Sequence, residues 1–158
     1  MELPYCAIDI STHDGKLKLF VTDIDEGTEE SRKRGGISAD FNIQVSVPGI
    51  NADFRCWVTL GYLHKFYMAL RDCYNNLCGT AVLTYYSKDL TNISIDFNAR
   101  GHCYVYGSAG YKNNWALSDN RIEFGFECDQ TYIGPNIKTL GTLFNELAAI
   151  QGSYEFLY

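Results

Sequence analysis

Residues 54–70 read FRCWVTLGYLHKFYMAL, and the spacing of the apolar side chains changes within this stretch. Phe54, Cys56 and Val58 alternate with Arg55 and Thr59, which is typical of a half-buried strand. From Leu60 onwards the apolar side chains instead recur every three or four residues, at Leu60, Leu63, Phe66, Tyr67, Leu70, Cys73, Tyr74 and Leu77. The stretch therefore predicts a strand that passes directly into a helix, with Thr59 as its N-cap and Gly79 as its left-handed end.

The same alternation recurs on both sides of this stretch. Three segments before it alternate, at residues 5–10, 16–22 and 40–47, and four segments after it, at residues 81–86, 93–98, 102–107 and 121–128. A second helical pattern begins at Gly134-Pro135, since proline is tolerated at the first helical position, and its apolar stripe is Ile137, Leu140, Phe144, Leu147 and Ala148. The order ββββα–ββββα predicts an α+β protein of two antiparallel four-stranded sheets with two main helices.

Length and composition bound the class of protein. The 158 residues fit the range of about 100–200 expected for one domain, so we predict a single domain over 1–158. No apolar run approaches the roughly 18 residues that a membrane span needs. The first residues lack the basic and apolar regions of a secretory signal. We therefore expect a cytoplasmic protein whose six cysteines are reduced thiols.

Negative charge is concentrated at the start of the chain. Residues 1–30 hold eight acidic and two basic side chains, whereas residues 31–158 hold eleven of each, so the whole net charge of −6 lies in the first segment. An acidic field repels phosphate backbones and attracts basic protein surfaces. The charge distribution thus favours a basic protein partner over direct nucleic-acid binding.

Two long loops, 23–36 and 108–119, contain the candidate binding residues. The first loop contains an acidic run that could attract a basic partner or could be only solvated surface: Asp23, Asp25, Glu26, Glu29 and Glu30. The second contains Tyr111 and Trp115 among polar neighbours. These two aromatic side chains either fix the loop to the core or act as interface anchors.

Catalytic and metal-binding motifs are not found in the sequence. It contains no nucleophile elbow, zinc-protease, phosphate-loop or dinucleotide motif, and no C-x-x-C pair, so no cofactor or metal is predicted. His102 and Cys103 are adjacent on a predicted strand and so point to opposite faces, which excludes them as a catalytic pair. A Cys–His pair between distant elements stays open, but we predict that the protein is not an enzyme.

Two motifs in the second half resemble a known family. They are the turn GHCYVYG at residues 101–107 and the segment FGFECDQTYI at residues 124–133, which leads into the last helix. Both resemble the WapI-like immunity proteins, which belong with the immunity proteins of contact-dependent growth inhibition. The resemblance covers about residues 54–150, and the element order is also similar to Whirly-type folds. It implies a bacterial cytosolic protein that binds and blocks one cognate toxin domain, often a nuclease.

The charge distribution fits that implied role. A nuclease must hold RNA or DNA in a basic cleft, and carboxylates on an inhibitor can imitate the phosphates. We therefore predict that the acidic run and the two loop aromatics bind the C-terminal nuclease domain of a toxin. Two alternatives stay open: a Whirly-like module for single-stranded nucleic acid, and a small enzyme that uses His102, Cys103 or a pair of carboxylates.

Overall fold

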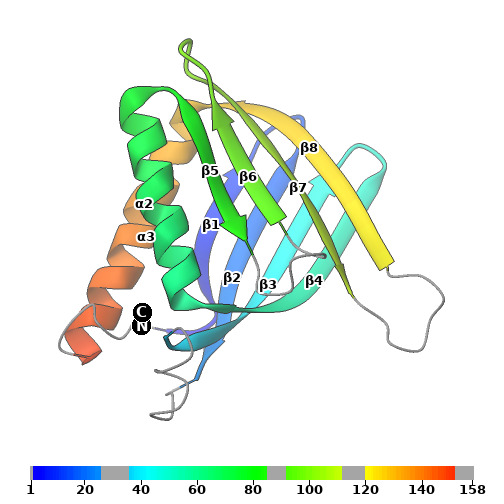
Figure 1. The fold of residues 1–158 in the computed structure, drawn as a ribbon. Helices are drawn as coiled ribbons and strands as arrows, with labels where there is room; N and C mark the ends of the chain where they lie inside the picture. Colours follow the sequence, from blue (N-terminus) through cyan, green and yellow to red (C-terminus); the bar gives the residue numbers. More distant parts are fainter. Residues whose placement is uncertain (1, 26–35, 85–91, 112–119, 152–158) are drawn as a thin grey trace.

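Eight strands and two helices follow the predicted order in the computed structural model, which describes residues 2–25, 36–84, 92–111 and 120–151 (Figure 1). The first sheet consists of β1 (Tyr5–Ser11), β2 (Lys16–Ile24), β3 (Ser38–Val47) and β4 (Ile50–Thr59). The helix α2 (Leu60–Asn76) follows it. The second sheet consists of β5 (Gly79–Thr84), β6 (Asn92–Phe97), β7 (His102–Tyr111) and β8 (Asn120–Asp129), and α3 (Gln130–Gln151) follows. The predicted α+β class is confirmed.

Each sheet is an antiparallel meander, because its strands pair in the order in which they follow along the chain. The apolar side of the alternation faces inward. Leu19 of β2, Phe41 of β3, Ile95 of β6 and Val105 of β7 are all buried. The polar side of each sheet is left on the outside of the molecule. Both sheets therefore share one hydrophobic core and present one outer face each.

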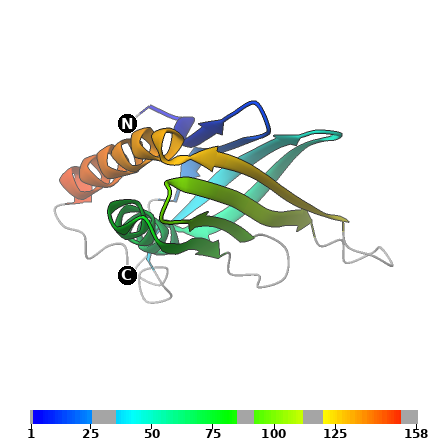
Figure 2. The same ribbon diagram turned by 90° about the horizontal axis from the view of Figure 1, so that it is seen from above.

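The two helices lie side by side along one side of the molecule, and the sheets extend away from them (Figures 1 and 2). Each helix packs mainly against the first strand of the sheet in the other half, α2 on β5 and α3 on β1. The apolar stripes of the helices, including Leu63, Phe66, Leu140 and Phe144, complete the core. The two halves are therefore interlocked.

The two halves also repeat one backbone connection. The first N–H of α2, that of Leu60, donates to the carbonyl of Ile37 at 2.8 Å, and the first N–H of α3, that of Gln130, donates to the carbonyl of Gly101 at 2.9 Å. Ile37 directly precedes β3, and Gly101 directly precedes β7. The acceptors thus occupy equivalent positions, and the coarse repeat in the sequence extends to individual hydrogen bonds.

The helix ends differ from the prediction in two places. The last helix begins at Gln130, earlier than the Gly134-Pro135 start, and Pro135 lies inside its N-terminal part. Its start is capped by Asp129, whose carboxylate accepts the backbone N–H of Thr131 at 2.8 Å and also the Thr131 hydroxyl. These hydrogen bonds hold the pKa of Asp129 below its ordinary value. The family-like segment FGFECDQTYI, in which Asp129 and Thr131 can cap a helix, therefore indicated the correct start, whereas Gly134-Pro135 did not.

The first helix also ends differently from the prediction. Its left-handed terminal residue is Leu77, with φ of 50°, although Gly79 also has a positive φ, of 95°. At its start, Thr59 occupies the N-cap position but makes no side-chain capping hydrogen bond. Its buried hydroxyl finds no partner in the described part of the chain. The first N–H of this helix is satisfied by the backbone of Ile37 instead.

Candidate functional site

The predicted binding residues are only partly within the described chain. Asp23 and Asp25 are exposed, and Asp23 lies in β2 and not in a loop as predicted. Tyr111 ends β7 and pairs with Asn120 of β8, so the second predicted loop begins later than expected. The remaining candidates, Glu26, Glu29, Glu30 and Trp115, lie outside the described residues.

The strand register adds two residues to the acidic pair. Asp40 of β3 lies directly opposite Asp23, and Trp57 of β4 lies directly opposite Asp40. Together with Asp25 and Ser38 these residues line a hollow of about 310 Å³ on the outer face of the first sheet, which we call the acidic groove. The sequence did not single out Asp40 or Trp57, because their position beside Asp23 depends on register.

Backbone and side-chain hydrogen bonds hold the groove in shape. The N–H of Asp25 donates to the carbonyl of Ser38 at 3.0 Å, which extends the pairing beyond the end of β2. The Thr22 hydroxyl donates to the carbonyl of Asp40 at 3.1 Å. The carboxylate of Asp23 accepts the N–H of Ile24 at 2.9 Å. The groove is therefore built on paired strands, which position its side chains more firmly than a loop would.

Like charges face each other in this groove. Carboxylates directly opposite on neighbouring strands repel one another, at a cost of about 0.2–1 kcal/mol. Among the described residues, no cation forms an ion pair with Asp23 or Asp40. Trp57 stands beside them with 42% of its surface exposed, which is unusual for a large aromatic side chain. The arrangement combines negative charge with an exposed aromatic anchor.

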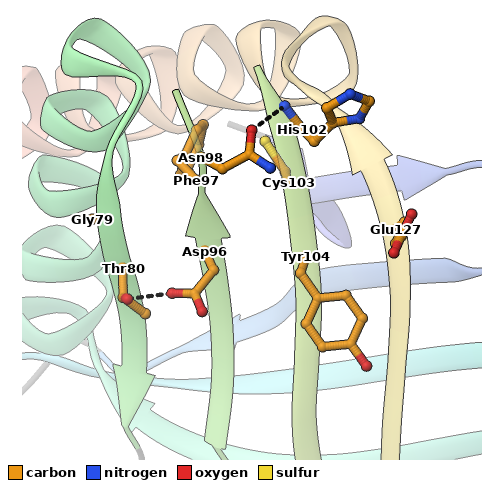
Figure 3. A pocket seen from close by; sticks show the side chains of 9 residues that line it. All are labelled: Gly79, Thr80, Asp96, Phe97, Asn98, His102, Cys103, Tyr104 and Glu127. Atoms are coloured by element: carbon orange, nitrogen blue, oxygen red, sulfur yellow. Dashed lines mark hydrogen bonds between the residues drawn. The ribbon is translucent and has the colours of Figure 1, made fainter. Parts of the chain in front are cut away.

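A second hollow lies on the outer face of the second sheet, with a volume of about 600 Å³ (Figure 3). It is lined by Gly79, Thr80, Asp96, Phe97, Asn98, His102, Cys103, Tyr104 and Glu127. Asp96 accepts the hydroxyl of Thr80, and the side chain of Asn98 accepts the N–H of His102 at 3.2 Å. Tyr104 is the most exposed of the large apolar and aromatic side chains in the described regions, at 46%. Of these residues, the sequence had marked His102 and Cys103 as candidates for a small enzyme.

The histidines and cysteines give no assembled catalytic pair within the described chain. Cys103 is buried and faces Cys128 on the neighbouring strand, whereas His102 is exposed, which confirms that the two adjacent residues point to opposite faces. A hydrogen bond between the two thiols lowers the pKa of Cys103 and raises that of Cys128. Burial raises the pKa of Cys56 to about 12. Buried thiols with raised pKa values behave as small apolar side chains.

His64 is likewise a packing residue. Its ring stands edge-on to Phe144 of α3 at 4.8 Å between centroids, and burial, followed by the charge of Arg71, lowers its pKa. In the described regions, no group of three or more potential ligand side chains could hold a metal ion. No described helix is long and apolar enough to cross a membrane.

These outer faces, with carboxylates beside exposed aromatic side chains, are suited to binding another macromolecule. The model of the immunity protein WapI-like family matches residues 9–148. The chain therefore belongs to the WapI-like immunity protein family. No curated protein and no solved structure matches the chain significantly.

The extent of the match corrects the sequence-based resemblance, which covered only about residues 54–150. The match begins at Asp9 and includes nearly all of the first sheet, so the acidic groove lies within the family region. Membership of this family supports a role as a toxin immunity protein, and such a role is non-enzymatic.

Proposed function

We propose that this protein neutralises a cognate nuclease toxin domain by binding it through the acidic groove. The observation that carries the proposal is the facing pair of carboxylates, Asp23 and Asp40, beside the exposed ring of Trp57. Membership of an immunity protein family supports the general role. The groove supplies the chemistry that the partner would recognise.

Electrostatics explains why a nuclease suits this groove. The active site of a nuclease must attract phosphates, so it exposes lysine and arginine side chains. Two facing carboxylates that repel each other in the free protein become favourable neighbours once a cation lies between them. Complementary charge of this kind raises the association rate and selects against acidic partners. The net charge of −6 adds long-range attraction to the same effect.

Trp57 supplies an exposed aromatic surface for binding, which the carboxylates cannot provide. Exposed tryptophan side chains are enriched among the few residues that dominate binding energy in protein interfaces. An adjoining hollow of about 470 Å³ shares Asp40 and Trp57 and also contains Arg55. Trp57 therefore lines two adjoining hollows that are open to toxin side chains. Since a nuclease toxin acts on cellular nucleic acid, we expect the protein to act in the bacterial cytoplasm, against a toxin delivered by a neighbouring cell.

The proposal is tested by the kinetics of binding to the cognate toxin domain. The double variant Asp23→Asn with Asp40→Asn should slow association by about three- to tenfold at low salt and flatten its salt dependence. Trp57→Leu should mainly speed dissociation, by about tenfold. Surface plasmon resonance at several salt concentrations measures both rates.

A matched control lies on the same face of the same sheet. Asp53 is also an exposed carboxylate, but it accepts hydrogen bonds from Asn42 and Gln44 and does not line the groove. Asp53→Asn removes the same charge and should change the rates much less. Equal rates for the wild type and the double variant would show that the groove is not the binding site.

A further inference from the structure

The outer face of the second sheet contains a row of three side chains across neighbouring strands. Asp96 of β6 lies directly opposite Tyr104 of β7, and Tyr104 lies directly opposite Glu127 of β8. Tyr104 thus has a carboxylate residue directly opposite it on each neighbouring strand, and all three side chains line the same hollow (Figure 3). We call this row the tyrosine platform.

A glycine on the neighbouring strand makes room for the tyrosine ring. A Cβ atom on Gly125 would lie 2.4 Å from the Tyr104 hydroxyl oxygen, much closer than any real contact. The ring therefore reaches across β8 at the position where a side chain is missing. It also stacks on Tyr106, with 5.4 Å between ring centroids and 25° between ring planes. Tyr104 is held against the sheet, yet 46% of its surface stays exposed.

The flanking carboxylates have no cationic partner in the described regions. Asp96 accepts a hydrogen bond from the Thr80 hydroxyl, which fixes its position without neutralising its charge. Arg121 of the same sheet pairs with Glu123 instead, at 3.3 Å. A fixed aromatic ring with an unneutralised carboxylate residue on each neighbouring strand is complementary to a planar cation. Guanidinium fits better than ammonium because it stacks on the ring and forms forked hydrogen bonds with carboxylates.

The repeat between the two halves gives an independent argument. Asp96, Tyr104 and Glu127 occupy the positions equivalent to Asp23, Asp40 and Trp57, because each row crosses its fourth strand three residues before the following helix begins. Each row contains two carboxylates and one exposed aromatic side chain. The same row of the fold therefore has the same chemistry on both outer faces.

We propose that the tyrosine platform receives an arginine side chain of the toxin domain, as a contact separate from the acidic groove. This inference rests on the proposed function in one respect, namely that the partner is a toxin domain. The chemistry of the site, a guanidinium stacked on Tyr104 between Asp96 and Glu127, can be tested on the isolated protein.

The experiment is a titration of the protein with N-acetyl-arginine amide, followed by backbone and tyrosine ring chemical shifts in NMR spectra. Saturable shifts should be centred on residues 96, 104, 125 and 127. N-acetyl-citrulline amide has the same shape without the charge and should give no saturable shifts there. N-acetyl-lysine amide should bind at least about threefold more weakly than the arginine probe.

Variants of the platform residues test separately how much the aromatic ring and the two carboxylates contribute to arginine binding. Tyr104→Leu and the pair Asp96→Asn with Glu127→Gln should each weaken arginine binding at least about threefold, whereas Tyr104→Phe should retain most of it. Gly125→Ala should displace the ring and weaken binding although Tyr104 is still present. Glu123→Gln removes an exposed carboxylate elsewhere on this sheet and should have no effect.

The outcomes also distinguish this inference from the proposed function. Equal shifts with arginine and citrulline, or shifts centred away from Tyr104, would overturn the platform as an arginine site. Slower toxin association in the Asp23 and Asp40 double variant would still support the acidic groove in that case. Conversely, a normal arginine titration with unchanged toxin kinetics in that double variant would reject the groove and retain the platform.

Discussion

Asn136 is a buried polar side chain on α3 that pairs with the backbone of β1, much as a neighbouring strand would. Its side-chain oxygen accepts the N–H of Asp9 at 2.6 Å, and its side-chain nitrogen donates to the carbonyl of Asp9 at 3.0 Å. The same nitrogen also donates to the carbonyl of Tyr132 at 2.7 Å. Since β1 is an edge strand, this amide satisfies backbone groups that would otherwise be open for pairing with another chain.

Replacing Asn136 should therefore be costly for a single polar residue. Asn136→Leu keeps the volume but leaves the backbone groups of Asp9 without partners, so the free energy of unfolding should fall by about 1–3 kcal/mol. Urea denaturation followed by circular dichroism measures this change. Thr142→Ala on the exposed side of α3 is the control and should change stability by less than about 0.5 kcal/mol. A similarly small effect of Asn136→Leu would contradict the pairing.

His64 makes stability depend on pH. Because burial lowers its pKa in the folded protein, the unfolded chain binds the proton more tightly at this residue. Its contribution to stability is complete above the ordinary histidine pKa of about 6.5 and is lost as the pH falls from there through the lower folded pKa. His64→Gln should therefore give a flatter dependence of unfolding free energy on pH between about 7 and 5. Parallel curves for the two proteins would disprove this role.

The tertiary contacts of His64 and Asn136 could not be predicted from the sequence. His64 follows Leu63 of the apolar stripe in the sequence, but its contact with Phe144 depends on how α2 and α3 pack. Asn136 stands between Pro135 and Ile137 in a segment that gives no sign of a buried amide. A buried polar residue is explained by its tertiary partner, and periodicity carries no information about that partner.

At the scale of elements, alternation was enough to predict all eight described strands, and apolar stripes with helical spacing predicted both described helices. It could not fix the register between strands, since register depends on turn geometry and local bulges. The pairing of Asp23 with Asp40 follows directly after such an irregularity, between Val21 and Asp23. The sequence therefore predicted the negative charge of the acidic groove, but not that Asp40 and Trp57 lie beside Asp23. It did not predict the tyrosine platform.

The two sheets meet closely where the β1–β2 turn contacts β8. A Cβ atom on Gly15 would lie 2.3 Å from the ring of Phe126, which is buried. Gly15→Ala should therefore lower the free energy of unfolding by about 1–3 kcal/mol through overpacking. Measurements of unfolding by urea would give this value.

A double-mutant cycle tests the cause of that loss. Phe126→Ala should be destabilising alone, but it also removes Cγ and Cδ1, the two ring atoms nearest to the methyl group added at position 15. The double variant should consequently be more stable than the sum of the two single changes implies. Strict additivity would mean that the loss in Gly15→Ala has another origin, such as strain within the turn.

At the scale of the whole molecule, each helix covers the first strand of the other half, so neither half can bury its own sheet alone. We expect the protein to unfold in one cooperative transition, in keeping with the prediction of a single domain. Tryptophan fluorescence and far-ultraviolet circular dichroism should give coincident urea denaturation curves. Two separate transitions, or an isolated fragment 1–77 that is folded as a monomer, would show that the halves are independent domains.

The repeated backbone connection, Leu60 to Ile37 and Gln130 to Gly101, bears on the ancestry of the chain. Such an arrangement is what duplication and fusion of a gene for one half would leave. If the chain arose in this way, two identical half-length chains exchanged their helices around a dyad axis, each one covering its partner's sheet. A synthetic tandem of two first halves, joined at the α2–β5 connection, should then regain a folded, twofold-symmetric body.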